Sequence, residues 1–521
     1  MIELTLARVA EIVGGRLADI TPEDAAATRI TGSVEFDSRA VTAGGLFLAL
    51  PGARSDGHDF AAAAVAAGAA AVLAARPVGV PAVIAPPAAG PEGSGVLEHD
   101  TDGAGAAVLA ALARLAATVA AELVEGGLRI VGITGSSGKT STKDLVAAVL
   151  APLGNVVAPP GSFNNELGHP WTVLRADRST DFLVLEMSAR HPGNIAALAA
   201  IAPPSIAVVL NVGTAHLGEF GSREAIAATK SELPQAVPAS GVVILNADDS
   251  AVAAMAAKTA ARVVRVSRDP GADLWADAVT LDELARPRFI LHAGGGEVPV
   301  ALAVHGDHQV SNALCAAAVA VECGATLDQV ATALAGAGPV SRHRMQVSTR
   351  ADGVTVVNDA YNANPDSMRA GLKALAWMAR SGGQERRGYL PPEGQGADSG
   401  GDSGGERRRS WAVLGEMAEL GEDSISEHDH IGRLAVRLDV SRLIVVGTGR
   451  SASAMHQGAV MEGSWGAEAT RVDDANAALA LLSEELRPGD VVLVKASKSA
   501  GLAPLADALA ADSERDGTAT R

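Results

Sequence analysis

An apolar strand that runs directly into a glycine-rich turn limits the possible folds of this chain more than any other segment. Residues 131–141 read V-G-I-T-G-S-S-G-K-T-S, so a Gly-Lys-Thr segment stands where a helix should begin. Backbone amides in such a turn bind polyphosphate oxygens, the lysine reaches the terminal phosphates, and the threonine hydroxyl takes a magnesium position. Ile133 stands where the usual phosphate loop has its first glycine, so this is a rarer, shorter form. The candidate ATP-binding residues of the loop are Gly135, Ser136, Ser137, Gly138, Lys139, Thr140 and Ser141.

Length and charge narrow the class of protein. At 521 residues the chain is long enough for about three domains, each with its own core. Hydrophobic residues make up 48% and charged residues 20%, which is the balance of a globular protein. The formal charge of −18 argues against bulk binding of nucleic acids or of anionic membranes. Cys315 and Cys323 belong to no catalytic or metal-binding pattern, so reduced thiols that pack as small apolar groups are expected.

Neither a targeting segment nor a membrane span is predicted. The N-terminus lacks the basic and apolar regions of a signal peptide. Residues 105–121 form a long apolar run, but Arg114 interrupts it and its larger apolar side chains recur at helical spacing, which indicates a core helix. We therefore expect a cytoplasmic protein without membrane insertion. We also expect the protein to act as a monomer.

Alternating strands and helices divide the chain into three α/β units. We expect a smaller N-terminal α/β domain at 1–104, a central domain at 105–338 and a C-terminal Rossmann-like α/β domain at 339–521. Strands separated by helices predict a doubly wound, mostly parallel sheet in the central domain, with ligands at the carboxyl ends of its strands. Residues 381–410 are rich in Gly, Ser, Glu and Arg and are predicted to be a disordered insert. The predicted strands are 45–50, 129–134, 182–186, 206–211, 242–246, 354–358, 411–414, 443–446 and 491–494.

Polar side chains follow several predicted strands of the central domain. Glu186 ends one strand, and a carboxylate there is the natural magnesium partner of a phosphate loop. His216 follows the next strand and is consistent with a metal ligand, a substrate contact or a structural hydrogen bond. Asn164 and Asn165 lie in a polar turn that either closes on itself or binds a polar substrate. Lys230 lies in a predicted helix, and by its sequence context alone it is an exposed lysine without a chemical role.

A second group of polar residues follows the first predicted strand of the C-terminal domain. Residues 358–367 read N-D-A-Y-N-A-N-P-D-S, which is more amide and carboxylate groups than a turn requires and favours a binding function. Arg344 lies just past the domain boundary, where its guanidinium is suited to neutralise phosphate charge in a domain that closes over a nucleotide. The candidate residues of the loop are Asp359, Tyr361, Asn362 and Asn364.

Taken together, these segments resemble the Mur ligase family, the ATP-dependent amide-bond ligases of peptidoglycan precursor synthesis. Residues 134–140 resemble the short phosphate loop of that family, and residues 306–313 resemble its central-domain motif, in which an asparagine, here Asn312, binds the adenine side of ATP. Further matches lie at residues 36–39, 56–58, 164–170, 359–365 and 415–421. The chain departs from the family's pattern at Ser188 and His343, where a glycine is usual.

The resemblance implies a division of labour among the three domains. The first would hold a UDP-sugar, the second ATP, and the third would close over the ATP. By resemblance, the catalytic residues are Lys139, Lys230, His216 and Arg344. Two magnesium ions would be held by Thr140, Glu186, His216 and a carbamylated Lys230. Beyond the phosphate loop, ATP would be bound by Asn312 and Asp359, and the other substrates by Ser38, Arg39, Asn164, Asn165, Tyr361, Asn362 and Asn364.

The resemblance also implies a reaction. The motifs match the branch of the family that joins D-alanyl-D-alanine to UDP-N-acetylmuramoyl-tripeptide and releases ADP and phosphate. A carboxylate resists attack by an amine, so it would first take the γ-phosphoryl group of ATP and form an acyl phosphate. Three alternatives stay open: the ligase that adds the third peptide residue, a folate polyglutamate ligase, and a phosphate-loop regulatory protein that ligates nothing.

Overall fold

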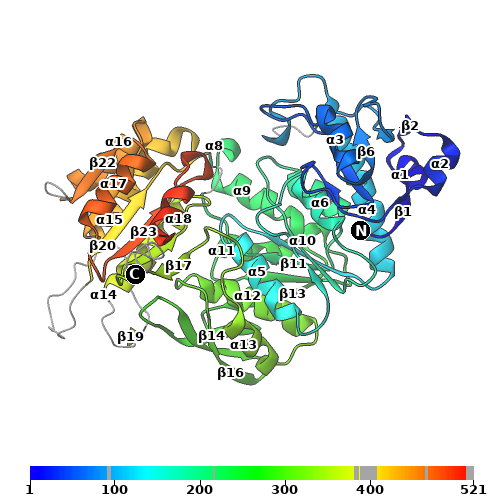
Figure 1. The fold of residues 1–521 in the computed structure, drawn as a ribbon. Coiled ribbons are helices and arrows are strands. Elements are labelled where there is room, and N and C mark those ends of the chain that lie inside the picture. The colour runs from blue at the N-terminus through cyan, green and yellow to red at the C-terminus, as the bar shows by residue number, and fades with distance from the viewer. Residues whose placement is uncertain (91–94, 215–216, 381–385, 388–407, 464–467, 512–521) are drawn as a thin grey trace, which may run out of the picture.

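Three α/β domains follow one another along the chain (Figure 1). The structure, a computed structural model, describes residues 1–521 apart from 91–94, 215–216, 381–385, 388–407, 464–467 and 512–521. The N-terminal domain is blue in Figure 1, the central domain cyan to green, and the C-terminal domain yellow to red. The predicted α/β class with three sheet-containing units is confirmed.

The N-terminal domain is built on a small sheet. Its elements are β1 (Leu4–Thr5), α1 (Leu6–Val13), β2 (Arg16–Ala18), α2 (Pro22–Ala27), β3 (Arg29–Ile30), β4 (Val34–Glu35), β5 (Gly45–Leu48), η1 (Gly57–Phe60), α3 (Ala61–Ala66), β6 (Ala69–Ala74), β7 (Ala82–Ile84) and η2 (Gly95–Leu97). The sheet order is β2-β7-β6-β5-β4, with β4 to β7 parallel and β2 antiparallel at the edge. The strand predicted at 45–50 is β5, which ends two residues earlier.

The central domain contains the largest sheet. Its elements are α4 (Ala104–Glu125), β8 (Arg129–Thr134), α5 (Lys139–Leu150), β9 (Val156–Val157), α6 (Gly168–Val173), β10 (Phe182–Glu186), α7 (Asn194–Ile201), β11 (Ile206–Val209), α8 (Leu217–Phe220), α9 (Arg223–Lys230), α10 (Glu232–Ala236), β12 (Val242–Asn246), α11 (Ser250–Ala253), η3 (Ala254–Lys258), β13 (Arg262–Ser267), β14 (Leu274–Leu281), β15 (Pro287–Ala293), β16 (Gly296–Ala301), α12 (Gln309–Glu322) and α13 (Leu327–Gly336). The order is β16-β15-β14-β13-β12-β11-β8-β10-β9, parallel from β9 to β14 and antiparallel from β14 to β16.

Helices cover both faces of the parallel part of this sheet, which explains its unbroken apolar strands. Val131 and Ile133 of β8 pack in one cluster with residues of α5, α12 and α13. Ile130 of the same strand packs on the opposite face with residues of α4 and α7. A parallel strand buried on both faces has no polar side to alternate with. The phosphate loop therefore follows a strand that is buried on both faces of the sheet.

The long apolar run predicted to be a core helix is α4. This helix is long and apolar enough to cross a membrane by length and composition, but over half of its most apolar window is buried inside the protein. It packs against α1 of the N-terminal domain and against α6 and α7 of the central domain. Val108, Leu112 and Leu115 are fully buried in the cluster that joins the two domains. The expectation of a core helix is confirmed.

The C-terminal domain is a second helix-covered sheet. Its elements are β17 (Gln346–Thr349), β18 (Thr355–Asn358), α14 (Pro365–Arg380), β19 (Arg386–Arg387), β20 (Ser410–Leu414), η4 (Gly421–Asp423), α15 (Ser424–Arg437), β21 (Arg442–Val446), α16 (Arg450–Met461), β22 (Ala469–Val472), α17 (Ala475–Glu485), β23 (Val491–Lys495), η5 (Lys498–Ala500) and α18 (Ala503–Ala511). The order is β17-β18-β23-β20-β21-β22, and only β17 runs antiparallel to its neighbour. The four strands predicted here are confirmed to within one residue at each end.

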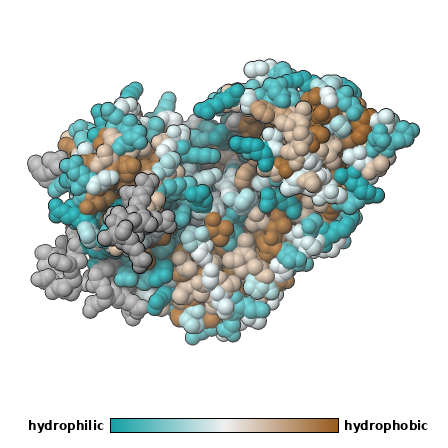
Figure 2. Space-filling model, viewed as in Figure 1, coloured by the Kyte–Doolittle hydropathy of each residue, from teal (hydrophilic) through white to brown (hydrophobic). Residues whose placement is uncertain are grey.

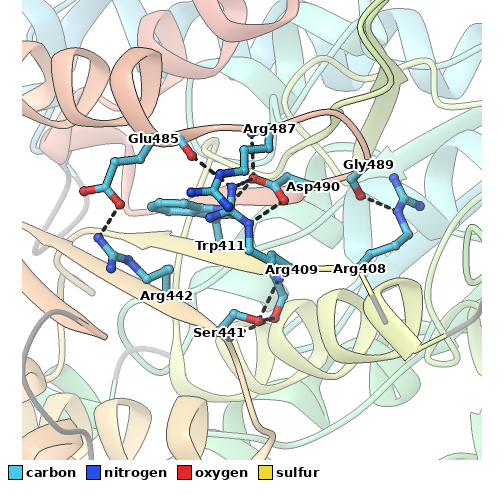
Figure 3. A network of polar contacts seen from close by, with 10 residues as sticks. Arg408, Arg409, Trp411, Ser441, Arg442, Glu485, Arg487, Gly489 and Asp490 are labelled. Atoms are coloured by element: carbon cyan, nitrogen blue, oxygen red, sulfur yellow. Dashed lines mark hydrogen bonds and ion pairs between the residues drawn. The ribbon is translucent and has the colours of Figure 1, made fainter. Parts of the chain in front are cut away.

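Within the predicted insert at 381–410, the structure describes only residues 386–387 and 408–410, because residues 381–385 and 388–407 lie outside the described part. Both described segments differ from the prediction of disorder. β19 pairs antiparallel with β14 of the central domain. Arg409 donates two hydrogen bonds to the buried Asp490, at 2.9 and 2.5 Å, and Trp411 Nε1 donates a third at 3.0 Å (Figure 3). Arg408 Nε donates to Gly489 O at 2.5 Å. A buried carboxylate requires charged partners, so Arg409 is structural, and the disorder predicted for residues 381–410 does not hold at Arg408 and Arg409.

Candidate active site

A cavity of about 1230 Å³ lies where the three domains meet. Its walls combine residues of α4, the phosphate loop, the loop before α6, the ends of β11 and β12, and the loop between β18 and α14. Figure 2 shows the hollow between the N-terminal and C-terminal domains, with hydrophilic residues around its rim. The site is therefore at the carboxyl edge of the central sheet, where ligands of doubly wound sheets bind.

The phosphate loop is held in a conformation that only glycine adopts easily. Gly138 has a φ of 82° and precedes α5, and a Cβ on it would lie 2.8 Å from Asn312 Oδ1. Asn211, two residues beyond the end of β11, accepts a hydrogen bond from Ser137 N at 2.9 Å. Lys139 Nζ donates to Gly135 O at 2.6 Å, so its ammonium lies across the mouth of the loop. The loop and the predicted adenine-side asparagine are thus in direct contact.

The charge of Lys139 is held in an unfavourable setting. Burial lowers the pKa of Lys139 to about 8, with Glu186 opposing the shift and Arg344 adding to it. An ammonium with too few anionic partners is stabilised by an incoming polyphosphate. The electrostatics therefore favour an anionic ligand at this loop.

The two carboxylate oxygens of Glu186, at the end of β10, differ in their contacts. Its Oε2 accepts hydrogen bonds from Thr140 Oγ1 at 3.2 Å and from Asn164 Nδ2 at 3.3 Å. Its Oε1 is buried and has no hydrogen-bond partner among the described residues. Burial raises the pKa of Glu186, and Lys143, Arg344 and Lys139 oppose the shift. A lone carboxylate oxygen beside a hydroxyl suits Mg²⁺, which takes oxygen ligands and keeps several waters.

No group of three or more His, Cys, Asp or Glu side chains in the described ranges is arranged to hold a metal. The candidate ligand His216 lies outside the described residues. Of the predicted magnesium ligands that the structure describes, the Glu186 carboxylate and the Thr140 hydroxyl lie within hydrogen-bond distance of each other and supply the oxygen atoms that this ion prefers.

The prediction that Lys230 is an exposed lysine without a role is wrong in its first part. Lys230 ends α9 and its relative exposure is 5%. Burial, followed by the charge of Lys139, lowers the pKa of Lys230 well below its usual value. Its Nζ has no hydrogen bond or ion pair with any described residue. Ile226 and Thr229 of the same helix are also buried, so this face of α9 packs inward, which the sequence context did not reveal.

Arg344 connects the C-terminal domain to the phosphate loop. Its Nη2 donates to Thr140 Oγ1 at 3.3 Å, and its guanidinium carbon lies 4.1 Å from the centroid of the Tyr361 ring. Asp359, at the end of β18, accepts hydrogen bonds from Lys495 Nζ at 2.6 Å and from Met345 N at 3.0 Å. Groups of the third domain therefore lie against the phosphate loop of the second.

His343, where a glycine is usual in the resembling family, adopts the conformation of a glycine. Its φ is 59°, in the left-handed region, and its Nε2 lies 3.1 Å from Asp507 Oδ2. Asp507 also accepts a hydrogen bond from Asn358 Nδ2 at 3.0 Å. The contact with Asp507 compensates for the backbone strain, which costs about 1–2 kcal/mol for a residue with a Cβ.

The structure brings most of the predicted site residues together. Those that line the cavity are Ser136, Ser137, Gly138, Lys139, Thr140, Ser141, Asn164, Asn165, Asn312, Arg344, Asp359, Tyr361, Asn362 and Asn364. Glu186 and Lys230 are buried behind the wall. Ser38 and Arg39 are not part of the lining; Arg39 is 88% exposed and pairs with Asp37 at 2.7 Å.

Several charged residues at the site were not identified from the sequence. Lys143, one turn after Lys139, donates to Pro159 O at 2.6 Å and is fully buried, and nothing in its spacing indicates this. Asp366 Oδ2 accepts a hydrogen bond from Thr214 N at 3.3 Å across the domain boundary. Lys495 and Lys498 line the cavity. Lys495 ends an apolar strand, as Glu186 does, so the same pattern in the sequence could have identified it.

Comparison with known proteins extends over nearly the whole chain. Three family models match in order: "Mur ligase family, catalytic domain" at 31–118, "Mur ligase middle domain" at 133–320, and "Mur ligase, glutamate ligase domain" at 400–498. The UDP-N-acetylmuramoyl-tripeptide–D-alanyl-D-alanine ligase of Mycobacterium tuberculosis is 72% identical, over 98% of this chain and 98% of the relative.

Solved structures agree with these matches. A crystal structure of MurF from Acinetobacter baumannii has a TM-score of 0.77 and 27% identity, and the match covers 98% of this chain and 99% of that one. MurF ligase from Thermotoga maritima, solved in complex with ADP, has a TM-score of 0.70 and 27% identity, over 94% and 99% of the two chains. Three family models match in order along the chain, and a relative is 72% identical over nearly its full length. This chain therefore belongs to the Mur ligase family.

Proposed function

We propose that this protein is an ATP-dependent ligase that joins D-alanyl-D-alanine to UDP-N-acetylmuramoyl-tripeptide, giving the UDP-muramoyl-pentapeptide of peptidoglycan synthesis. The observation that carries the proposal is the 72% identity to a ligase of that name over nearly the whole chain. The cavity supports it, because a phosphate loop and a polar loop of another domain face the same space. Such a site is suited to transfer between a nucleotide and a second substrate.

The proposed reaction has two chemical steps, which the residues of the site would support. The tripeptide carboxylate attacks the γ-phosphorus of ATP, the bond to the β–γ bridging oxygen breaks, and an acyl phosphate and ADP result. Lys139 and Arg344, both placed at the loop, neutralise charge on the transferring phosphoryl group. The amine of the dipeptide then attacks the acyl carbon, loses a proton, and expels phosphate from the tetrahedral intermediate.

Metal binding at this site is part of the proposal. Thr140 Oγ1 and Glu186 Oε1 would hold Mg²⁺, and His216 and Lys230 would complete two ion positions. When bound, the ions supply positive charge that offsets the negative charge of the phosphates. Lys230 supports this assignment because its pKa is lowered well below its usual value, and a neutral amine is the form that reacts with carbon dioxide to give a carbamate.

The remaining assignments follow the same family relation. We place the UDP-sugar on the N-terminal domain near Ser38 and Arg39, and the domain limits at 104 and 338. Substrate contacts are assigned to Asn164, Asn165, Tyr361, Asn362 and Asn364, and the adenine side of ATP to Asn312 with Asp359. The protein is proposed to act in the cytoplasm as a monomer. The alternatives of a third-residue ligase, a folate ligase or a regulatory nucleotide-binding protein have no observation in their favour.

A substrate-omission assay tests the proposal. Purified protein is incubated with ATP, D-alanyl-D-alanine and UDP-muramoyl tripeptides carrying either meso-diaminopimelate or lysine, and product is identified by mass spectrometry. Pentapeptide and equimolar ADP are expected only when all three substrates are present. Lys139→Ala should abolish product, whereas Lys373→Met, a lysine of α14 outside the cavity lining, should not. Equal ATP hydrolysis with and without the dipeptide would overturn the ligase function.

A further inference from the structure

The incoming dipeptide presents the cavity with a charge that must be matched. Its amine has to approach the acyl phosphate as a neutral nucleophile, while its C-terminal carboxylate stays ionised at neutral pH. An anion held in a partly desolvated cleft requires a cation or several hydrogen-bond donors. A residue that receives this carboxylate would orient the amine and select a dipeptide acid.

Six basic side chains line the cavity, and five of them already have oxygen partners. The five contacts are Lys139 to Gly135 O at 2.6 Å, Arg190 to Glu419 at 2.7 Å, Arg223 to Val212 O at 2.9 Å, Arg344 to Thr140 Oγ1 at 3.3 Å and Lys495 to Asp359 at 2.6 Å. The sixth is Lys498, which is exposed. Within the described ranges its ammonium has no hydrogen bond and no ion pair. It is the basic group in this lining that is free to take an anion.

Lys498 lies at a suitable distance from the reacting end of the cavity. It opens η5, the short turn after β23, and its Nζ is 6.0 Å from the centroid of the Tyr361 ring. Arg344, which reaches the phosphate loop, lies 4.1 Å from the same centroid. These two distances place the cations within about 10 Å of each other, and an extended dipeptide spans about 7 Å. A dipeptide along the Tyr361 ring therefore joins the two ends.

We propose that Lys498 receives the C-terminal carboxylate of D-alanyl-D-alanine, with Tyr361 as the wall along which the dipeptide lies. The assignment rests on the proposed function and adds to it the contact that fixes the second substrate. Arg344 serves the phosphoryl end and Lys498 the carboxylate end. The amine is thereby directed toward the acyl phosphate and away from the cation.

Steady-state kinetics of Lys498→Met test the assignment. The loss of a charge-assisted contact should raise the KM for D-alanyl-D-alanine about 10- to 100-fold. The KM values for ATP and for the UDP-tripeptide should stay within about twofold of wild type. Lys498→Arg should keep most of the affinity, because it retains the charge. Lys373→Met is the matched control and should leave all three KM values unchanged.

A substrate analogue separates a charge contact from a merely structural role. Wild type should use the dipeptide amide, which lacks the carboxylate, far less well than the acid, and Lys498→Met should lose this discrimination. An unchanged preference for the acid, or a raised KM for ATP in place of the dipeptide, overturns the assignment while the ligase function stands. A wild-type protein that forms no pentapeptide overturns both. If Lys498→Met fails to fold, the acid-to-amide preference of Lys498→Gln decides by the same criterion.

Discussion

Replacement of Gly218 by alanine should impair ligation without unfolding any domain. Gly218 lies in α8 of the central domain and meets the backbone of Gly421, which opens η4 of the C-terminal domain. A Cβ on Gly218 would lie 2.5 Å from Gly421 N and 2.6 Å from Gly421 Cα. Its φ is not in the left-handed region, so alanine introduces no strain within α8 itself. The whole effect falls on the contact between the two domains.

The size of the effect follows from the overlap. Backbone atoms cannot rotate away as a side chain can, so the domains must separate by roughly 1 Å to reach ordinary contact distance. Overpacking of this kind costs about 1–3 kcal/mol. Since the cavity takes residues from both domains, the cost falls on the closed, reactive arrangement. We expect kcat/KM for ligation to fall roughly 5- to 150-fold.

Kinetics and thermal unfolding measured together test this reasoning. The unfolding temperature of Gly218→Ala should change by no more than about 2 °C, because the cores of the two domains are untouched. Gly218→Val should be worse than Gly218→Ala. Gly336→Ala is the control, since nothing lies within 4 Å of a Cβ there, and its activity should match wild type. Wild-type activity in Gly218→Ala, or a decrease equal to that of Gly336→Ala, would refute the account.

Three further predictions concern buried charges. Lys139→Met should abolish ligation yet keep or raise the unfolding temperature. Because burial lowers the pKa of Lys139 to about 8, this lysine destabilises the folded protein as the pH falls from about 10.5 through 8. The variant should lose that pH dependence of stability. Asp490→Asn removes the ion pair with Arg409 and should lower the free energy of unfolding, measured by urea titration, by about 1–3 kcal/mol. The KM values of the substrates should not change, because the ion pair lies at the opposite end of the strands from the cavity. Burial lowers the pKa of His428, whose Nε2 accepts a hydrogen bond from Met417 N at 2.9 Å. As the pH falls through about 6.5, the unfolded chain binds a proton at this histidine more readily than the folded chain does, so the free energy of unfolding should fall. This decrease should be smaller in His428→Gln.

The success of the strand predictions depended on burial. β8, β10 and β12 begin and end where their apolar runs do, because helices cover both faces of the sheet there. β14 to β16 were not predicted: β15 and β16 each bury only alternate residues, and β14 has an irregular burial pattern with a break in register between Asp277 and Thr280. Antiparallel strands with one open face carry a weaker signal in a single sequence.

Two charged segments show where local composition misleads. Arg408 and Arg409 resemble the polar segment before them, yet they are fixed by Gly489 and Asp490, about 80 residues away in the chain. Lys230 resembles a surface lysine, yet it is buried near Lys139. In both cases the groups that surround the charge are remote in sequence, so no window of neighbouring residues contains the information.

The sequence by itself determined the phosphate loop, the order of the three α/β domains and the family, because each depends on residue types at short spacing. Only the tertiary structure decided which charges are paired. Arg344 lies beside Thr140, and Lys495 beside Asp359, across more than 100 residues of chain. Lys498 is left free in the same cavity. Pairing and desolvation depend on distances in space, and these exist only once the domains have packed against one another.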